Sequence, residues 1–426
     1  MRILIKGGRV IDPAHGIDKL QDVYVADGRI AALGKPPEGF RPDHTIDVRK
    51  HIVCPGLVDL SAHLREPGAE HKATIASETR AAAAAGITTL CCPPDTDPVI
   101  DTPAVVELIR HRAEQAGFAR VIPLGALTKA LAGAELTEMA ALKAVGCTSL
   151  TNTRLPINNS LVMRRIMEYA ATHDITVFLH PEDSALANHG CAHEGAVATR
   201  LGLPGVPESA ETAALARDLA LIEQTGVRAH FCRLSSARSV RMVARAQHEG
   251  LSVTADVCAH PLYLTEMDIG LFNSHCHVLP PLRTLRDRDG LRNGLADGTL
   301  GAICSDHQPH EPDAKLAPFT ETEPGISALE TLLPLTLRLA DENLLSLPEA
   351  LAFVTSKPAQ ILRIEAGTLE PGRIADICIF DPEHYWTLTE RTLVSRGHNT
   401  PFLNWELKGR VTHTLLGGKL VHQLSP

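Results

Sequence analysis

Hydrophobic and polar residues alternate in two different ways along the chain. In the first fifty residues, segments such as RILIKGGRVID and VYVADGRIAALG change sides every second position, which is typical of half-buried strands. From about Gly56, continuous apolar runs alternate with helical patterns, and Gly86, Gly226 and Gly250 end three of the expected helices. The apolar runs number eight, and we expect strands at residues 57–63, 87–92, 120–125, 147–151, 175–180, 227–233, 251–258 and 300–305.

Eight strand-helix units predict an α/β fold built on a (β/α)8 TIM barrel. Strand-like alternation returns after about Ile364, in ADICIFDP and in GRVTHTLLGGKLVH. Neither terminal segment is able to bury a face alone, so we expect the two to form one small β-sandwich together. The predicted domains are therefore residues 1–53 plus 364–426 for the sandwich and residues 54–363 for the barrel.

Chemically active side chains recur where the predicted strands end. In the first barrel strand, a period of two places Ser61, His63 and Arg65 on one side. His180 and Asp306 end the fifth and eighth strands, and His260 follows the seventh. Because the carboxyl ends of barrel strands meet at one rim, we expect these residues to surround a common site.

Composition narrows the possible functions. The chain has 426 residues, 44% of them hydrophobic and 21% charged, with a net charge of -9 and no basic stripe. This distribution gives no sign of nucleic-acid or membrane binding. No run reaches membrane-spanning length and the N-terminus lacks a cleavable signal, so we expect a cytoplasmic protein. The 10 cysteines are scattered without a CxxC pair, which favours buried, reduced thiols over disulfides.

Several long strings resemble the dihydroorotase family of the amidohydrolase superfamily. They occur in the same order over essentially the whole chain: HLREPG at 63–68, PVID at 98–101, HEGAVATRLGLPG at 193–205, PPLR at 280–283, SDHQPH at 305–310, GISALET at 325–331 and the closing NTPFLNWELKGRV. The resemblance implies an amidohydrolase-type barrel with a split β-sandwich. It also implies zinc-dependent opening or closing of the dihydroorotate ring in pyrimidine biosynthesis.

The residues that the family uses to hold metal are only partly kept. His63, His180 and Asp306 match family ligands, and Asp306 matches the residue that also shuttles a proton. Three other ligand positions differ: Ser61 replaces the first histidine of His-x-His, Asn152 replaces a strand-four aspartate, and Arg233 replaces the strand-six histidine.

The substrate-binding positions differ as well. Arg65 and His310 match the family, whereas Asp95 and Leu279 stand where asparagines are expected. A carboxylate at position 95 repels an anionic dihydroorotate that Arg65 attracts. We therefore expect Arg65, Asp95 and His310 to be vestiges of a substrate site.

Zinc needs three or four converging lone pairs at about 2.0–2.3 Å. Serine and asparagine are poor donors to it, and a guanidinium offers no lone pair and carries a permanent positive charge. We therefore expect no bound zinc, no other cofactor and no dihydroorotase activity. We further expect Arg233 to occupy the former metal space and pair with Asp306; the alternative is that Arg233 reaches solvent at the barrel mouth.

The resemblance implies a function without catalysis. Dihydroorotase-like chains with lost ligands associate with aspartate carbamoyltransferase, so the first hypothesis is a non-catalytic chain of that enzyme. The resemblance implies a complex of six catalytic and six dihydroorotase-like subunits, in which the dihydroorotase-like subunits also form dimers. The first alternative is a divergent zinc amidohydrolase using His63, His180 and Asp306, with help from His260. The second is a regulatory nucleotide-binding subunit, which the lack of a glycine-rich phosphate loop disfavours.

Overall fold

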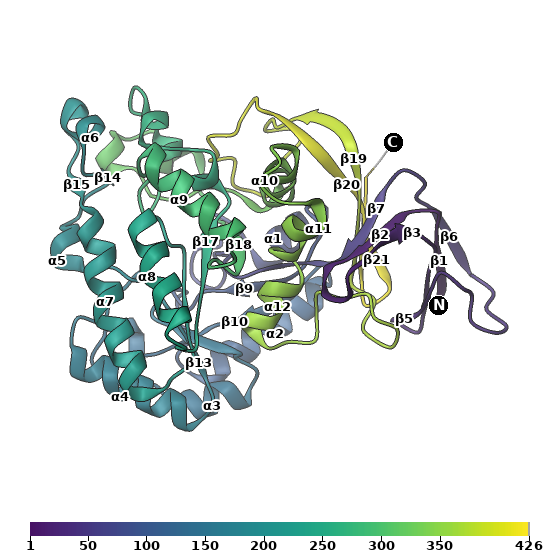
Figure 1. Ribbon diagram of the computed structural model, residues 1–426, viewed down its shortest axis with the longest axis horizontal. Helices are drawn as coiled ribbons and strands as arrows, with labels where there is room; N and C mark the ends of the chain where they lie inside the picture. Colours follow the sequence, from purple (N-terminus) through teal and green to yellow (C-terminus); the bar gives the residue numbers. More distant parts are fainter. Residues whose placement is uncertain (425–426) are drawn as a thin grey trace.

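The computed structural model describes residues 1–424, and Figure 1 shows a barrel beside a smaller β-sheet unit. All eight expected barrel strands are present. Their order is β8 (Leu57–Asp59), β9 (Ile87–Cys92), β10 (Arg120–Pro123) with β11 (Gly125–Ala126), β12 (Ser149–Thr151), β13 (Thr176–Leu179), β16 (Ala229–Phe231), β17 (Val253–Cys258) and β18 (Ala302–Cys304). Neighbouring strands pair in parallel, and a parallel bridge between Ala62 and His307 joins the last strand end to the first. The predicted TIM barrel is therefore confirmed.

Helices follow the barrel strands and cover their outer side (Figure 1). They are α1 (Ile75–Ala84), α2 (Pro103–Ala116), α3 (Met139–Ala144), α4 (Ser160–Thr172), α5 (Ser184–Ala187), α6 (Ala196–Leu201), α7 (Glu208–Thr225), α8 (Ala237–His248), α9 (Leu285–Ala296), α10 (Leu329–Asp341), α11 (Leu347–Ala352) and α12 (Ser356–Leu362). A short parallel pair, β14 (Ala192–His193) with β15 (Gly205–Val206), extends from the barrel between β13 and β16. Parallel strands buried on both faces read as continuous apolar runs, as in β9, where all residues are buried.

The sandwich brings both ends of the chain together. One sheet has the order β5-β4-β1-β6 and the other the order β21-β20-β19-β7-β2-β3. The N-terminal strands are β1 (Arg2–Lys6), β2 (Arg9–Asp12), β3 (Ile17–Leu20), β4 (Val23–Ala26), β5 (Arg29–Leu33), β6 (His44–Asp47) and β7 (Ile52–Pro55), and the C-terminal ones are β19 (Ile377–Thr387), β20 (Glu406–Leu416) and β21 (Lys419–Gln423). In Figure 1 the purple and yellow strands accordingly lie on the same side of the barrel.

Backbone conformation explains the two hairpins that the sequence indicates. Asp27 and Gly28 join β4 to β5 with φ of 51° and 78°, and Gly417 and Gly418 join β20 to β21 with φ of 54° and 72°. Positive φ at both turn residues matches the twist of the flanking strands. A cluster of apolar residues from both chain ends, including Ile5, fills the space between the two sheets.

Two expectations from composition have direct counterparts in the structure. All ten cysteines are buried and unpaired in disulfides. Among residues 1–424, none of the helices has both the length and the apolar character needed to cross a bilayer.

Candidate functional site

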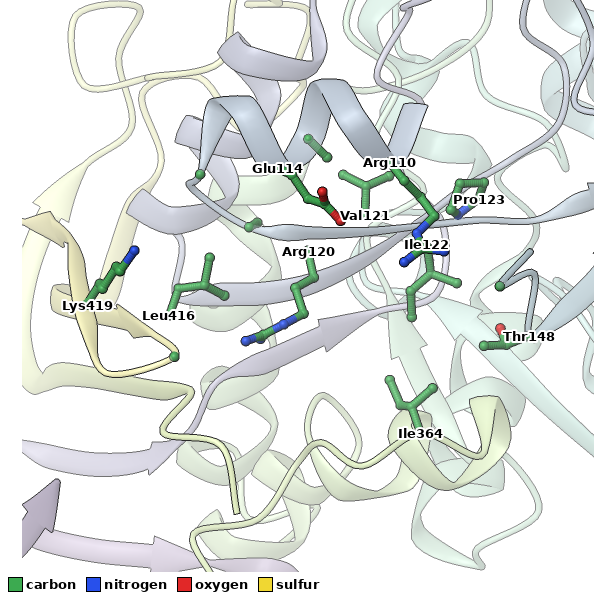
Figure 2. Close-up of a pocket in the computed structure, with 15 residues that line it drawn as sticks. Arg110, Glu114, Arg120, Val121, Ile122, Pro123, Thr148, Ile364, Leu416 and Lys419 are labelled. Carbon is green, nitrogen blue, oxygen red and sulfur yellow. The ribbon is translucent and has the colours of Figure 1, made fainter. Parts of the chain in front are cut away.

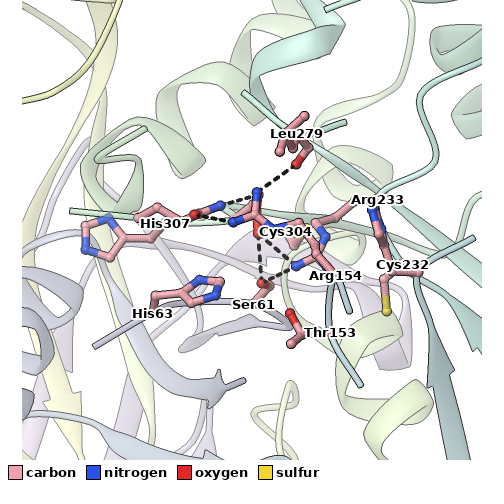
Figure 3. Close-up of polar contacts among 12 residues, drawn as sticks. Ser61, His63, Thr153, Arg154, Cys232, Arg233, Leu279, Cys304 and His307 are labelled. Atoms are coloured by element: carbon pink, nitrogen blue, oxygen red, sulfur yellow. Dashed lines mark hydrogen bonds and ion pairs between the residues drawn. The ribbon is translucent and has the colours of Figure 1, made fainter. Parts of the chain in front are cut away.

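The candidate site lies at the carboxyl ends of the barrel strands, and its centre is an ion pair. Arg233 Nη1 donates to Asp306 Oδ1 at 2.9 Å, and both side chains are 4% exposed. The Ser61 hydroxyl joins the pair: it donates to Asp306 Oδ1 at 3.1 Å and accepts from Arg233 Nη1 at 3.1 Å. Figure 3 shows this triangle of contacts, so the predicted pairing of Arg233 with Asp306 is present.

The charges of the site hold Asp306 ionised. Burial opposes the ionisation of Asp306, but Arg233 and then Arg154 outweigh it and keep the pKa of Asp306 well below its usual range. In return, Asp306 overcomes the effect of burial on Arg233 and raises the pKa of that guanidinium. The pair is therefore a salt bridge of fully charged groups inside the barrel.

Arg154 and Gln308 complete the network, and sequence reasoning gave neither of them a role. Arg154 donates to the Leu279 carbonyl at 3.3 Å and to Gln308 Oε1 at 2.9 Å, and Gln308 Nε2 donates to Asp306 Oδ2 at 3.0 Å (Figure 3). Both residues lie in the segments that follow barrel strands, Arg154 after β12 and Gln308 after β18, which is the signal that could have identified them. A second arginine thus lies in the mouth, beside Leu279, where the family has an asparagine.

The two residues that follow strand four, Asn152 and Thr153, have different surroundings. Asn152 does not join the ion pair, because its Oδ1 accepts from the backbone N and the hydroxyl of Thr128, both at 3.1 Å. Thr153 lines a small cavity with His180, and its buried hydroxyl has no hydrogen-bond partner among residues 1–424. The left-handed φ of 49° at Thr153 turns the chain at the strand end, and the sequence pattern carries no sign of that turn.

Left-handed backbone is a shared property of the site. Arg65, Thr153, Arg233 and Asp306 all have positive φ, of 63°, 49°, 55° and 47°. Non-glycine residues adopt such conformations at a cost of about 1–3 kcal/mol each, and they cluster at active sites and ligand clamps. The barrel mouth therefore has the backbone geometry that is typical of a functional site.

The predicted substrate residues lie together at one side of the mouth. Arg65 Nε donates to the Pro309 carbonyl at 3.0 Å, and Arg65 Nη2 lies 3.1 Å from His310 Nε2. His63 Nε2 lies 3.1 Å from Asp95 Oδ2. Burial disfavours a charged Asp95, yet His63, Arg154 and Arg65 outweigh it and hold the pKa of Asp95 well below its usual range.

The remaining histidines of the mouth are buried and neutral. Burial, with the positive charges of Arg233 and Arg154, lowers the pKa of His180 to about 3. Burial lowers the pKa of His260 to about 4. Within residues 1–424, hydrogen-bond partners are absent for both ring nitrogens of His180 and for the Nδ1 atoms of His63 and His260.

The cavities at this site are small. One of about 150 Å³ is lined by residues that include His63, Arg65 and Asp95. Another, of about 20 Å³, lies between Thr153 and His180. Sites for small organic ligands measure about 300–1,000 Å³. Both of these cavities fall below that range.

Sequence comparison identifies two family models and several individual proteins that are similar to this chain. The family described as dihydro-orotase-like matches residues 50–239, and the amidohydrolase family matches residues 313–422. A dihydroorotase-like protein of Pseudomonas putida is 52% identical over 422 residues, which is 99% of each chain. A dihydroorotase of Syntrophotalea carbinolica is 46% identical over the full length of both chains. This chain belongs to the dihydroorotase-like proteins of the amidohydrolase family.

Solved structures agree with this family at the level of fold. The L-hydantoinase from Arthrobacter aurescens has a TM-score of 0.89 at 22% identity and covers 99% of this chain and 96% of its own. A D-hydantoinase structure has a TM-score of 0.83 at 23% identity, with 99% and 95% covered. The dihydroorotase-like chain therefore has the amidohydrolase fold of a barrel with a β-sandwich.

The dihydroorotase family implies zinc, and the residues of this mouth do not fit it. Only one set of three potential ligands within residues 1–424 has its donor atoms within 4.8 Å of one another, and it consists of His230, Cys232 and Asp256. Those three are buried below the mouth, and both nitrogens of His230 are engaged, with Thr254 at 2.8 Å and Asp256 at 2.9 Å. Asp306, a retained ligand, has a guanidinium in contact instead. A cation at that point repels a second cation.

Proposed function

We propose that this chain is a non-catalytic dihydroorotase-like subunit, a pseudoenzyme without zinc or another cofactor. The observation that carries the proposal is the ion pair of Arg233 with Asp306 at 2.9 Å. The guanidinium supplies the positive charge that a buried carboxylate needs, but it has no open coordination position. It neither acidifies a water molecule nor polarises a ring carbonyl as a metal does.

The surroundings of the pair support the same function. Leu279 and Asp95 replace uncharged hydrogen-bonding residues of the family, and Arg154 extends to the Leu279 carbonyl across the mouth. The Asp95 carboxylate, whose pKa His63 lowers, repels an anionic dihydroorotate. The changes thus affect the binding of substrate as well as its activation.

We further propose that the chain supports the assembly and activity of aspartate carbamoyltransferase in the cytoplasm, as part of pyrimidine biosynthesis. The partner, the six-plus-six stoichiometry and the dimerisation of the dihydroorotase-like chains rest on the family resemblance. An intact barrel with a rebuilt mouth is consistent with this function, because a scaffold depends on the surface of the fold and not on a metal.

Co-expression with the aspartate carbamoyltransferase catalytic chain of the same organism tests the partner. We expect one hetero-oligomer with equal numbers of both chains, and we expect carbamoyltransferase activity to fall when this chain is omitted. An Asp95→Asn variant, altered only inside the mouth, is the matched control and keeps both assembly and activity. A carbamoyltransferase that assembles fully alone, beside a separate pool of this chain, contradicts the proposal.

One observation favours a second function, a divergent zinc amidohydrolase. His63 and His180 have buried ring nitrogens without hydrogen-bond partners, and such atoms are available as metal ligands. Relatives that carry the name dihydroorotase are 42–46% identical to this chain. Stoichiometric zinc in the purified chain, together with turnover of dihydroorotate, identifies this function; a metal-free inactive chain excludes it.

A further inference from the structure

A cavity of about 600 Å³ lies at the far end of the barrel from the ion pair (Figure 2). The mouth residues follow the carboxyl ends of the strands, whereas this cavity is lined by β10 from its first residue on and by Gly146 and Thr148, which precede β12. Helix α2, Ile364 and the hairpin between β20 and β21 complete the wall. Ligand sites of about 300–1,000 Å³ occur preferentially where two domains meet, as the barrel and the sandwich do here.

The wall combines apolar side chains with an excess of basic ones. Ile122 and Ile364 belong to its apolar part, and its charged residues are Arg110, Arg120, Lys419 and Glu114. Figure 2 shows Arg110 on one side of Ile122, with Arg120 and Lys419 toward the hairpin at the other end. Basic side chains outnumber the single acidic one, Glu114, and an excess of positive charge at a cavity favours an anionic ligand.

The hydrogen bonds of the basic residues leave donors free. Arg110 Nη1 donates to the Val145 carbonyl at 2.8 Å, which orients the guanidinium and leaves its other N–H groups available. Arg120 pairs with Asp376, so its charge is already compensated. In the part of the chain that the structure describes, no carboxylate oxygen lies within 4.0 Å of Arg110 or of Lys419. Arg110 is therefore the strongest anion-binding group of this cavity.

Two further features at the Arg110 end suit a ligand. The Thr148 side chain lines the cavity, and its hydroxyl has no hydrogen-bond partner among residues 1–424, so this donor is free for a ligand. Gly146 has φ of 109°, and a Cβ there would lie 2.8 Å from Arg110 Nη1. Glycine at this position lets the chain pass close to the guanidinium without displacing it.

We infer that this cavity binds a small organic anion, with its carboxylate or phosphate group at Arg110 and Thr148 and its apolar body against Ile122 and Ile364. Arginine binds both kinds of oxyanion through paired N–H donors, and the apolar wall adds affinity through burial of the ligand body. The site is separate from the barrel mouth.

Isothermal titration of the full chain with octanoate, AMP and inorganic phosphate tests this inference. We expect octanoate or AMP to bind once per chain, and the tighter of the two identifies the anionic group as carboxylate or phosphate. Inorganic phosphate alone binds at least tenfold more weakly because it has no apolar body. Arg110→Gln lowers the affinity at least tenfold, and Thr148→Val, which keeps the side-chain shape, lowers it about threefold.

Arg245→Gln is the matched control, since Arg245 lies on the barrel exterior with its side chain 80% exposed. This variant keeps the affinity of the unchanged chain. The inference is overturned when neither octanoate nor AMP binds with a Kd below about 1 mM. It is also overturned when phosphate alone binds as tightly as the organic probes, or when binding survives both Arg110→Gln and Thr148→Val.

Discussion

The Arg233 guanidinium and the Asp306 carboxylate form a salt bridge of 2.9 Å, with each side chain 4% exposed (Figure 3). A buried charge is tolerated only when a partner of opposite sign compensates it. In this chain the guanidinium of Arg233 compensates the Asp306 carboxylate. The salt bridge therefore supplies the compensation that both buried charges require.

Removal of one partner of this salt bridge is expected to cost more than removal of both. Arg233→Met leaves Asp306 buried without compensation and lowers the free energy of unfolding by about 3–5 kcal/mol. The double variant Arg233→Met with Asp306→Leu also removes the buried carboxylate, and it therefore recovers most of the lost free energy of unfolding. Urea denaturation of the single and double variants measures both effects.

The exposed pair of Arg245 and Glu249, with an Nε–Oε1 distance of 2.7 Å, is the control for this cycle. Arg245→Met lowers the free energy of unfolding by at most about 1 kcal/mol, because water screens the exposed pair. If the decreases in the free energy of unfolding caused by Arg233→Met and by Asp306→Leu simply add up in the double variant, the proposed compensation is contradicted.

Restoring three ligands is expected to restore metal binding. Ser61→His, Thr153→Asp and Arg233→His together replace the guanidinium and add three donors beside His63, His180 and Asp306. We expect the triple variant to hold about one zinc ion per chain, as measured by mass spectrometry of the metal after dialysis.

The matched control of this reconstruction uses Asn152→Asp in place of Thr153→Asp. Since the Asn152 side chain bonds to Thr128, a carboxylate at position 152 is directed away from the mouth. The control variant therefore binds less zinc. Equal zinc contents in the two triple variants would contradict the placement of Thr153 at the site.

Glu330 is expected to make stability depend on pH. Burial raises the pKa of Glu330 to about 7, from an ordinary value of about 4.3. The folded state therefore binds more protons than the unfolded state between these values, and the free energy of unfolding falls as pH rises through them. Glu330→Gln stays neutral and still accepts from the Val394 amide, so its stability relative to the unchanged chain rises by about 2–3 kcal/mol between pH 5 and pH 8.

Glu349→Gln provides a comparison of opposite sign. Hydrogen bonds from the Ser346 side chain and backbone lower the pKa of Glu349, so its ionised form stabilises the fold at neutral pH and this stabilisation is lost on acidification. Thermal unfolding at several pH values compares the two variants. A Glu330→Gln variant with the same pH profile as the unchanged chain would contradict the assignment.

The sequence predicts the barrel well because its strands are buried on both faces. Runs such as ITTLCC at β9 are apolar or small throughout, as expected of a strand that is buried on both faces. The hairpin glycines at 28 and 417 indicate turns because glycine readily adopts the positive φ that these turns require. The salt bridge of Arg233 with Asp306 is also predictable, because both residues end strands whose carboxyl ends meet at one rim.

Features that depend on local backbone turns or on distant contacts escape such reasoning. The left-handed φ of 49° at Thr153 is one such local turn. Arg154 meets Leu279 and Gln308, which are 125 and 154 positions away along the chain. The cavity at Arg110 is likewise built from barrel and sandwich segments that only the completed fold brings together.

The metal content of the purified chain, determined together with dihydroorotate turnover on the same sample, tests the central claim most directly. We expect less than about one-tenth of a zinc ion per chain and no turnover above the uncatalysed rate, even after incubation with excess zinc, because Arg233 compensates Asp306 in place of a metal. One tightly held zinc ion per chain with measurable turnover would contradict the account.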